Sequence, residues 1–173
     1  AFDTAVAENL ALQAMKHSEI GIQGEGLRAL GTYGSARSID IILEHFSGRD
    51  KELQLAATYA IARMPGNALN ARVNRLLRSE SEKDAVLGIQ MLGYRDIPGA
   101  KGKLFKFVNG ENSTLARDAL KTLSTTADEE DLYRLLFLAR RSDEDLRKTI
   151  AGMLKKVAPE IGSLELQAKV KQL

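Results

Sequence analysis

The chain has 173 residues, with 25 Lys and Arg against 23 Asp and Glu, so its formal net charge is +2. It contains no Cys or Trp, 44% of its residues are hydrophobic and only 5% are aromatic. The lack of Cys excludes disulfides, thiolate metal sites and cysteine nucleophiles. The near-neutral charge gives no bulk attraction to nucleic acids or membranes, and no apolar run approaches the roughly 20 residues of a membrane-spanning helix. The chain begins at Ala1 without Met, so we expect a processed chain or part of a larger protein.

The first predicted element is a leading helix over residues 3–17, and a series of two-helix repeats follows it. The clearest helix of the series covers residues 52–64, where Leu53, Ala57 and Ile61 lie on one face and a Pro-Gly turn ends the segment. Five repeats with approximate bounds 20–50, 51–81, 82–112, 113–143 and 144–173 complete the chain.

A constant spacing of 31 residues relates the repeats. The anchor positions carry aliphatic residues, namely Leu30, Ile61, Leu92, Leu123 and Leu154. Twelve residues after each anchor the chain is again aliphatic, at Ile42, Val73, Leu104, Leu135 and Leu166. Four residues before each anchor, four of the five residues are small, at Gly26, Ala57, Gly88 and Ala119 but not at Ile150. The residues at equivalent positions of the five repeats form what we call repeat columns. The two aliphatic columns predict a buried stripe, and the column of small residues predicts places where helices approach each other closely.

Each repeat contains two helical segments separated by a short breaker. The predicted breakers are 34–35, 65–67, 96–99, 125–128 and 158–159. With the leading helix, this pattern predicts eleven helices and no strand. A helix pair of about 30 residues cannot bury its apolar face alone, so neighbouring repeats must stack into a continuous core. We therefore expect one all-α domain over residues 1–173.

Three segments resemble the second helix of HEAT-like repeats. They are Leu-Arg-Ala-Leu-Gly at 27–31, Gln-Leu-Ala-Ala-Thr-Tyr-Ala-Ile-Ala at 54–62 and Leu-Ala-Arg-Asp-Ala-Leu-Lys-Thr-Leu at 115–123. They are most similar to the short repeats of phycobilisome-lyase-type arrays, and Arg117 and Arg147 occupy the family's Arg position. The resemblance implies an armadillo-like α-solenoid, a right-handed superhelix with helices like 52–64 on its concave wall and helices like 68–78 on its convex wall. It also leaves open a role as a lyase or chaperone for a chromophore.

Several motifs suggest chemistry, but each has a structural interpretation. The Gly24–Ala29 segment matches a dinucleotide fingerprint but lacks the preceding strand that this motif needs. The acidic clusters at 128–131 and 143–145 fall where helices begin, so we expect them to cap free amides. His17 and His45, without Cys, form no zinc set. We therefore predict no catalytic residues, no metal and no cofactor, which makes this a non-enzymatic protein.

Two surfaces remain as candidate binding sites. The expected concave wall presents solvent-facing residues two before or two after the anchors, and Tyr and Arg are enriched at protein interfaces. Its candidate partner-binding residues are Arg28, Tyr59, Arg63, Gln90, Tyr94 and Lys121, and the same positions also include Thr32, Thr125, Gly152 and Lys156. The helices on the expected convex wall, such as 68–78, which come second in each 31-residue repeat of this chain, carry a predicted basic stripe made of Arg72, Arg75, Lys103, Lys106 and Arg134. This stripe could track a phosphate backbone, although we expect no aromatic residues between its charges to stack bases.

The leading helix has apolar residues beyond one stripe, including Phe2 and Val6. We expect these two side chains to rest against an upstream domain or a partner. The function that we expect is a monomeric scaffold module, which holds a protein or peptide in its concave groove or joins domains of a larger protein. Nucleic-acid backbone binding through the basic stripe is the alternative, and no membrane association is expected.

Overall fold

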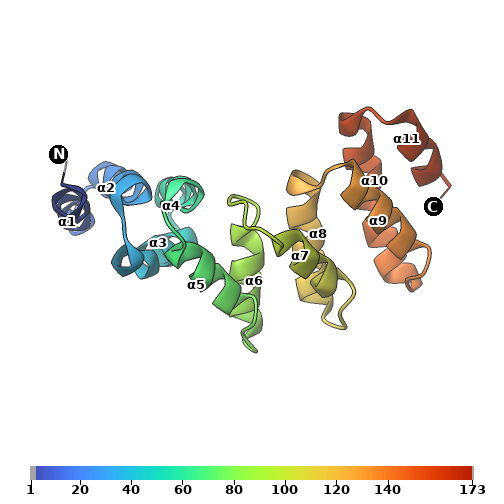
Figure 1. The fold of residues 1–173 in the computed structure, drawn as a ribbon, viewed down its shortest axis with the longest axis horizontal. Helices are drawn as coiled ribbons and strands as arrows, with labels where there is room; N and C mark the ends of the chain where they lie inside the picture. The colour runs from blue at the N-terminus through green and yellow to red at the C-terminus, as the bar shows by residue number, and fades with distance from the viewer. Residues whose placement is uncertain (1–2, 173) are drawn as a thin grey trace. The chain divides into compact units, whose positions relative to one another are not determined.

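The structure, a computed structural model, describes residues 3–172 and folds them into eleven α-helices and one short 3-10 helix (Figure 1). The helices up to residue 97 are α1 (Thr4–Ala14), α2 (Ile20–Tyr33), α3 (Ile39–Phe46), α4 (Lys51–Arg63), α5 (Ala68–Leu76) and α6 (Glu82–Met91), with the 3-10 helix at Ala36–Ser38 before α3. The later helices are α7 (Ala100–Val108), α8 (Ser113–Thr126), α9 (Glu129–Ala139), α10 (Glu144–Ile161) and α11 (Leu164–Val170). No strand occurs within residues 3–172. The all-α prediction with eleven helices is confirmed.

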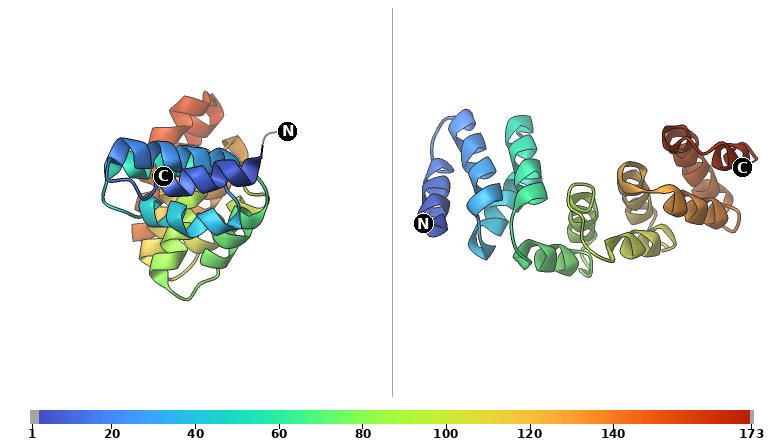
Figure 2. Two further views of the ribbon diagram at one scale, coloured as in Figure 1. Left: turned by 90° about the vertical axis from the view of Figure 1, so that its left-hand side faces the viewer. Right: turned by 45° about the horizontal axis from the view of Figure 1, so that its top comes forward.

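The chain divides into two compact units, Ala1–Ile97 and Pro98–Leu173, and the division falls within the predicted breaker at 96–99. In the first unit, α2 packs against α1 and α4, α3 packs against α4, and α5 packs against α6. Figure 2 shows α1, α2 and α4 side by side. In the second unit, α8 packs against α7 and α10, while α9 and α11 pack against α10 and against each other. This packing between neighbouring helices is that of a helical array. The single domain and the right-handed superhelix stay predictions.

The repeat columns account for the core of both units. The five anchor residues are at most 6% exposed, and the five residues twelve positions later are at most 1% exposed. Both columns therefore point inward, as the 31-residue spacing predicted. Burial of such aliphatic side chains contributes about 1.5–3 kcal/mol each relative to exposure, so these columns supply the main driving force of the fold.

Small residues allow neighbouring helices to approach each other closely. A Cβ added to Gly31 of α2 would lie 2.6 Å from Cα of Ala60 on α4. A Cβ on Gly26 would lie 3.0 Å from the carbonyl oxygen of Ala11 on α1. Gly26 thus belongs to a helix–helix contact in the middle of α2. This confirms the structural interpretation of the motif at 24–29.

Side-chain caps determine where many of the helices begin. Asp3, Asp50, Ser81, Asn112 and Ser163 each accept a hydrogen bond from an amide in the first turn of α1, α4, α6, α8 and α11, respectively. The predicted acidic caps also occur. Asp143 accepts from the amide of Leu146, and Asp128 forms a reciprocal capping box with Asp131 at the start of α9. The local sequence therefore encodes these helix starts.

The predicted breaker at 158–159 is wrong, because α10 continues through Pro159 and ends only at Ile161. A proline removes one backbone donor and usually interrupts a helix interior. Here it lies in the last turn, while the adjacent Val157 and Ala158 are buried and hold that turn against the core. Gly162, with a φ of +78°, ends the helix in the left-handed conformation that favours glycine.

Candidate functional site

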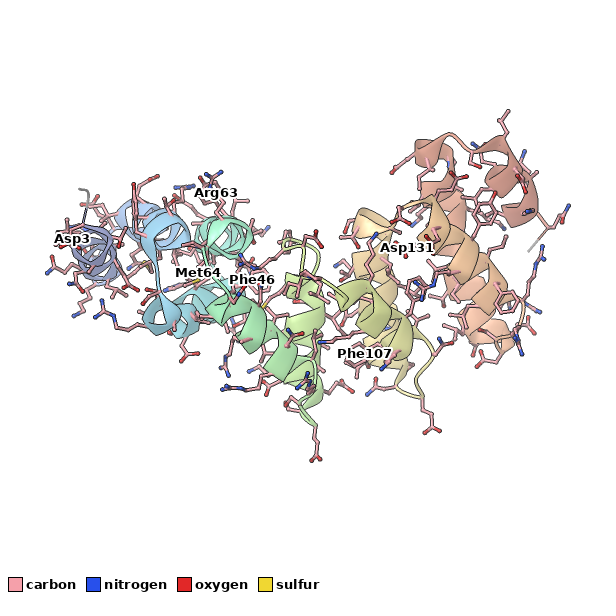
Figure 3. All side chains as sticks on the ribbon, viewed as in Figure 1. Asp3, Phe46, Arg63, Met64, Phe107 and Asp131 are labelled. Carbon is pink, nitrogen blue, oxygen red and sulfur yellow. The ribbon has the colours of Figure 1, made fainter. Side chains whose placement is uncertain are left out.

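The predicted wall residues Tyr59, Arg63 and Tyr94 lie at two places in the first unit. Tyr59 and Arg63 lie one turn apart on α4, and the Arg63 guanidinium is 5.3 Å from the centre of the Tyr59 ring. Tyr94 lies in the turn after α6 and meets Phe46 of α3 edge-on, with ring centres 5.9 Å apart. Figure 3 labels Arg63 and Phe46 on their helices. Tyr94 is thus engaged within the protein, although 51% of it is exposed.

The other predicted residues of this wall have different surroundings. Arg28 on α2 forms an ion pair with Glu25 at 2.6 Å, and Gln90 is exposed on α6. Lys121 is exposed on α8 of the second unit. The six candidate residues therefore belong to two compact units, and their action as one surface stays a prediction.

The second unit contains an open groove of about 590 Å³ between α8 and α10, here called the α8–α10 groove. Four positions predicted for the concave wall line it, namely Lys121, Thr125, Gly152 and Lys156. Its remaining lining residues are Arg117, Leu120, Ser124, Lys148, Thr149, Met153, Val157 and Glu160. The packing of α8 against α10 brings these positions together. α8 is the first helix of the repeat 113–143, and α10 is the first helix of the repeat 144–173.

Cations dominate the charged lining of the α8–α10 groove. Arg117, Lys121, Lys148 and Lys156 face one acid, Glu160. Lys148 forms an ion pair with Glu144 at 2.7 Å on the same helix. None of the other three cations forms an ion pair with an acid among residues 3–172. The groove therefore offers positive charge that the rest of the unit leaves uncompensated.

The floor of the α8–α10 groove is apolar, and its walls carry hydroxyl groups. Leu120, Met153 and Val157 are at most 9% exposed and close the groove from below. The hydroxyls of Ser124 and Thr149 donate to backbone carbonyls of their own helices, at 2.7 and 2.9 Å. Their lone pairs remain able to accept from a ligand amide. This combination of apolar floor, polar walls and charged rim is suited to a polypeptide segment.

A second groove of the same unit, about 770 Å³, lies along α9. The Arg134 guanidinium stacks 4.0 Å from the centre of the Phe105 ring, and Arg141 stacks 5.2 Å from that of Phe137. Phe137 is 62% exposed. Arg141 is not one of the five predicted stripe residues, so the predicted lack of aromatic residues between the stripe charges stays a prediction. Phe137 and Leu138 occupy the turn between Arg134 and Arg141, and period-3.6 spacing places them near both arginines.

The predicted basic stripe is partly engaged within the protein. Arg72 on α5 pairs with Asp40 of α3 at 3.2 Å, and its buried Nε atom has no hydrogen-bond partner in the described part of the chain. Arg134 lies 3.8 Å from Asp131. Arg75 and Lys106 are exposed on α5 and α7, and Lys103 is also on α7. The five residues belong to two compact units, so the continuity of the stripe stays a prediction.

Glu8 has a shifted pKa and holds a helix end in place. Burial by itself would raise the pKa of Glu8, but hydrogen bonds from Ser38 and Ser35 and the charge of Arg37 outweigh it and lower this pKa. Glu8 lies on α1, and its carboxylate thereby binds the start of the segment that leads into α3. The sequence did not single out this residue. The position of Glu8 on the apolar face of α1, beside Ala11, could have indicated a buried and hydrogen-bonded carboxylate.

Lys101 of α7 binds the capping box of α9 in a similar way. Its ammonium group is 2.7 Å from carboxylate oxygens of both Asp128 and Asp131 (Figure 3 labels Asp131). These hydrogen bonds raise the pKa of Lys101 and lower that of Asp128. The acidic residues at the start of α9 thus serve the packing of α7 and α9.

Other classes of site find no support in the described part of the chain. Within residues 3–172, no group of three His, Asp or Glu side chains could hold a metal ion. No helix in that range has the length and apolar character to cross a membrane. No family model matches the chain, and no curated protein matches it.

Proposed function

We propose that this protein is a non-enzymatic interaction module that binds a segment of a protein partner, or of an adjacent domain, in the α8–α10 groove. The observation that carries the proposal is the convergence of four predicted wall positions, Lys121, Thr125, Gly152 and Lys156, around one groove. Unpaired cations at the rim, hydroxyls on the walls and an apolar floor provide the kinds of contact that a peptide segment uses.

The ionisable groups with shifted pKa values hold helices and helix ends in place. Glu8, Lys101, Asp128 and Arg95 each contact a neighbouring helix or helix end, whereas Lys169 pairs with Glu165 on its own helix. These five residues lie outside the lining of the α8–α10 groove. In this protein the shifted groups stabilise the array.

The proposal is tested by selecting peptides from a random displayed library against the whole chain, then measuring their affinities by fluorescence anisotropy. We expect Lys121→Glu/Lys156→Glu to weaken the selected peptides by about tenfold or more, because it reverses two rim charges. The matched control is Lys51→Glu/Arg78→Glu, which reverses two exposed cations of the first unit. Selected peptides whose affinity is the same for wild type and the groove variant would contradict the proposal.

A second candidate is the nucleic-acid backbone, which the exposed ring of Phe137 between Arg134 and Arg141 favours. Aromatic faces beside cations are the platform on which single-stranded bases stack. Such binding must weaken steeply with salt, because each phosphate contact releases counterions. Titration of labelled oligothymidine at increasing salt, with Phe137→Ala/Arg141→Ala as the variant, tests this candidate. Salt-insensitive or absent binding at low salt would remove it.

A further inference from the structure

We infer that the α8–α10 groove selects an acidic peptide segment, and that this segment passes directly over Gly152. The inference rests on the proposed function and names the class of its partner. Two independent features of the groove support it, the conformation and surroundings of Gly152 and the arrangement of cations on both sides of this residue.

Gly152 has no role in the conformation or packing of the chain. It lies in the interior of α10, it is exposed, and its φ is not positive. A Cβ added there would meet no atom within 4 Å. In contrast, Gly31 is required by its close approach to Ala60. A glycine inside a helix costs about 0.5–1 kcal/mol of stability relative to alanine. At Gly152, no contact within the protein offsets this cost.

The position of Gly152 provides a reason for the missing side chain. It lines the α8–α10 groove, where a bare backbone leaves room for a ligand chain to lie close to the helix. Gly102 of α7 is also exposed with open space around its Cβ position, but it does not line this groove. The two glycines therefore form a matched pair, one inside and one outside the proposed site.

Cations flank Gly152 along α10 and across the groove. Lys148 and Lys156 lie four residues before and after it, which separates their Cα atoms by about 12 Å along the helix axis. Arg117 and Lys121 lie one turn apart on the facing helix α8. Lys148 is paired with Glu144, and Glu160 is the acid that lines the groove, so Arg117, Lys121 and Lys156 give a segment that crosses Gly152 a net positive environment. Carboxylates are the complementary groups.

The lining favours a peptide over a nucleic acid. Among residues 3–172, no aromatic side chain lines the α8–α10 groove, so bases would find no stacking platform there. The floor of Leu120, Met153 and Val157 instead fits an aliphatic side chain between the carboxylates. The ligand that fits this lining is a short peptide segment that combines Glu or Asp with leucine-like residues.

The test uses the whole chain and a fluorescent peptide of Glu and Leu residues, with a second peptide that carries Gln in place of each Glu. We expect the Glu peptide to bind at low salt at least about tenfold more tightly than the Gln peptide. Lys121→Gln/Lys156→Gln should remove this preference. Gly152→Met should weaken the Glu peptide about tenfold, because its side chain fills the space above α10.

The control is Gly102→Met, which should leave the affinity unchanged. Thermal unfolding of both glycine variants should show no loss of stability, since Met favours the helix and neither site is crowded. This measurement separates a blocked groove from a misfolded protein.

The outcomes separate this inference from the proposed function. Equal binding of the Glu and Gln peptides, with both lost in Gly152→Met, would overturn the acidic preference but keep the peptide-binding groove. Binding that neither Gly152→Met nor the Lys variant changes would overturn the site itself. Preferential binding of oligothymidine, lost in the Lys variant, would overturn the peptide class in favour of a polyphosphate ligand.

Discussion

Replacement of Arg95 by Met should strongly destabilise the first unit, because Arg95 caps the end of α4. One guanidinium nitrogen, Nη1, is 2.9 Å from the carbonyl oxygens of both Ile61 and Met64. The other, Nη2, is 3.2 Å from that of Gly66, and Nε is 2.5 Å from the side-chain oxygen of Asn70. In a continuing helix, the Ile61 carbonyl would accept from the amide four residues later. That residue is Pro65, which has no N–H.

The magnitude follows from the contacts that Met cannot make. A hydrogen bond with a charged donor contributes about 1.5–3 kcal/mol, and a carbonyl left without a partner costs about 1–3 kcal/mol. The contact with Gly66 is exposed, so water replaces it and it contributes little. The Ile61 and Met64 contacts remain, and we expect Arg95→Met to lower the free energy of unfolding by about 3 kcal/mol. Met preserves the packing of the aliphatic stem.

The assay is urea unfolding followed by circular dichroism, with Arg49→Met as the control. Arg49 is exposed in the loop between α3 and α4, so its loss should change stability by less than about 0.5 kcal/mol. Arg95→Lys should be intermediate, because an ammonium group cannot bridge several carbonyls as the planar guanidinium does. A loss below about 1 kcal/mol for Arg95→Met would refute the argument, since it would show that water satisfies these carbonyls equally well.

Three further substitutions test the contacts between helices. Gly31→Ala should lower the free energy of unfolding by about 1–3 kcal/mol, because the added Cβ would lie 2.6 Å from Cα of Ala60. An unchanged midpoint in urea unfolding would contradict this close approach. Lys101→Met should lower the free energy of unfolding by about 1–2 kcal/mol, because it removes the ammonium group 2.7 Å from the buried carboxylate of Asp131. A variant as stable as the wild type would contradict this role of Lys101. The lowered pKa of Glu8 stabilises the fold fully above its ordinary value of 4.5, and this contribution is lost as the pH falls through the folded-state pKa. Glu8→Gln should therefore flatten the acid side of the stability profile, and an unchanged profile would assign the acid sensitivity to other groups.

The aliphatic columns and the helix starts could be predicted from the sequence because both depend on neighbours close along the chain. The 31-residue spacing identified the residues that became the core, including Leu30 and Ile42. Short polar residues before apolar runs identified caps such as Asp128 and Asp143. Periodicity and capping are properties of one helix, so they require no knowledge of how helices pack.

Contacts between helices could not be predicted in this way. The sequence placed Tyr94 on a groove wall, but the turn after α6 brings its ring to Phe46. It placed Lys121 and Lys156 on one wall, but only the packing of α8 against α10 shows the apolar floor between them. No sequence pattern marks Arg95, because its role depends on the Ile61 carbonyl of α4, which Pro65 leaves without an amide partner. Local patterns determine which helices form and which face is buried, whereas interhelical distances decide which side chains meet.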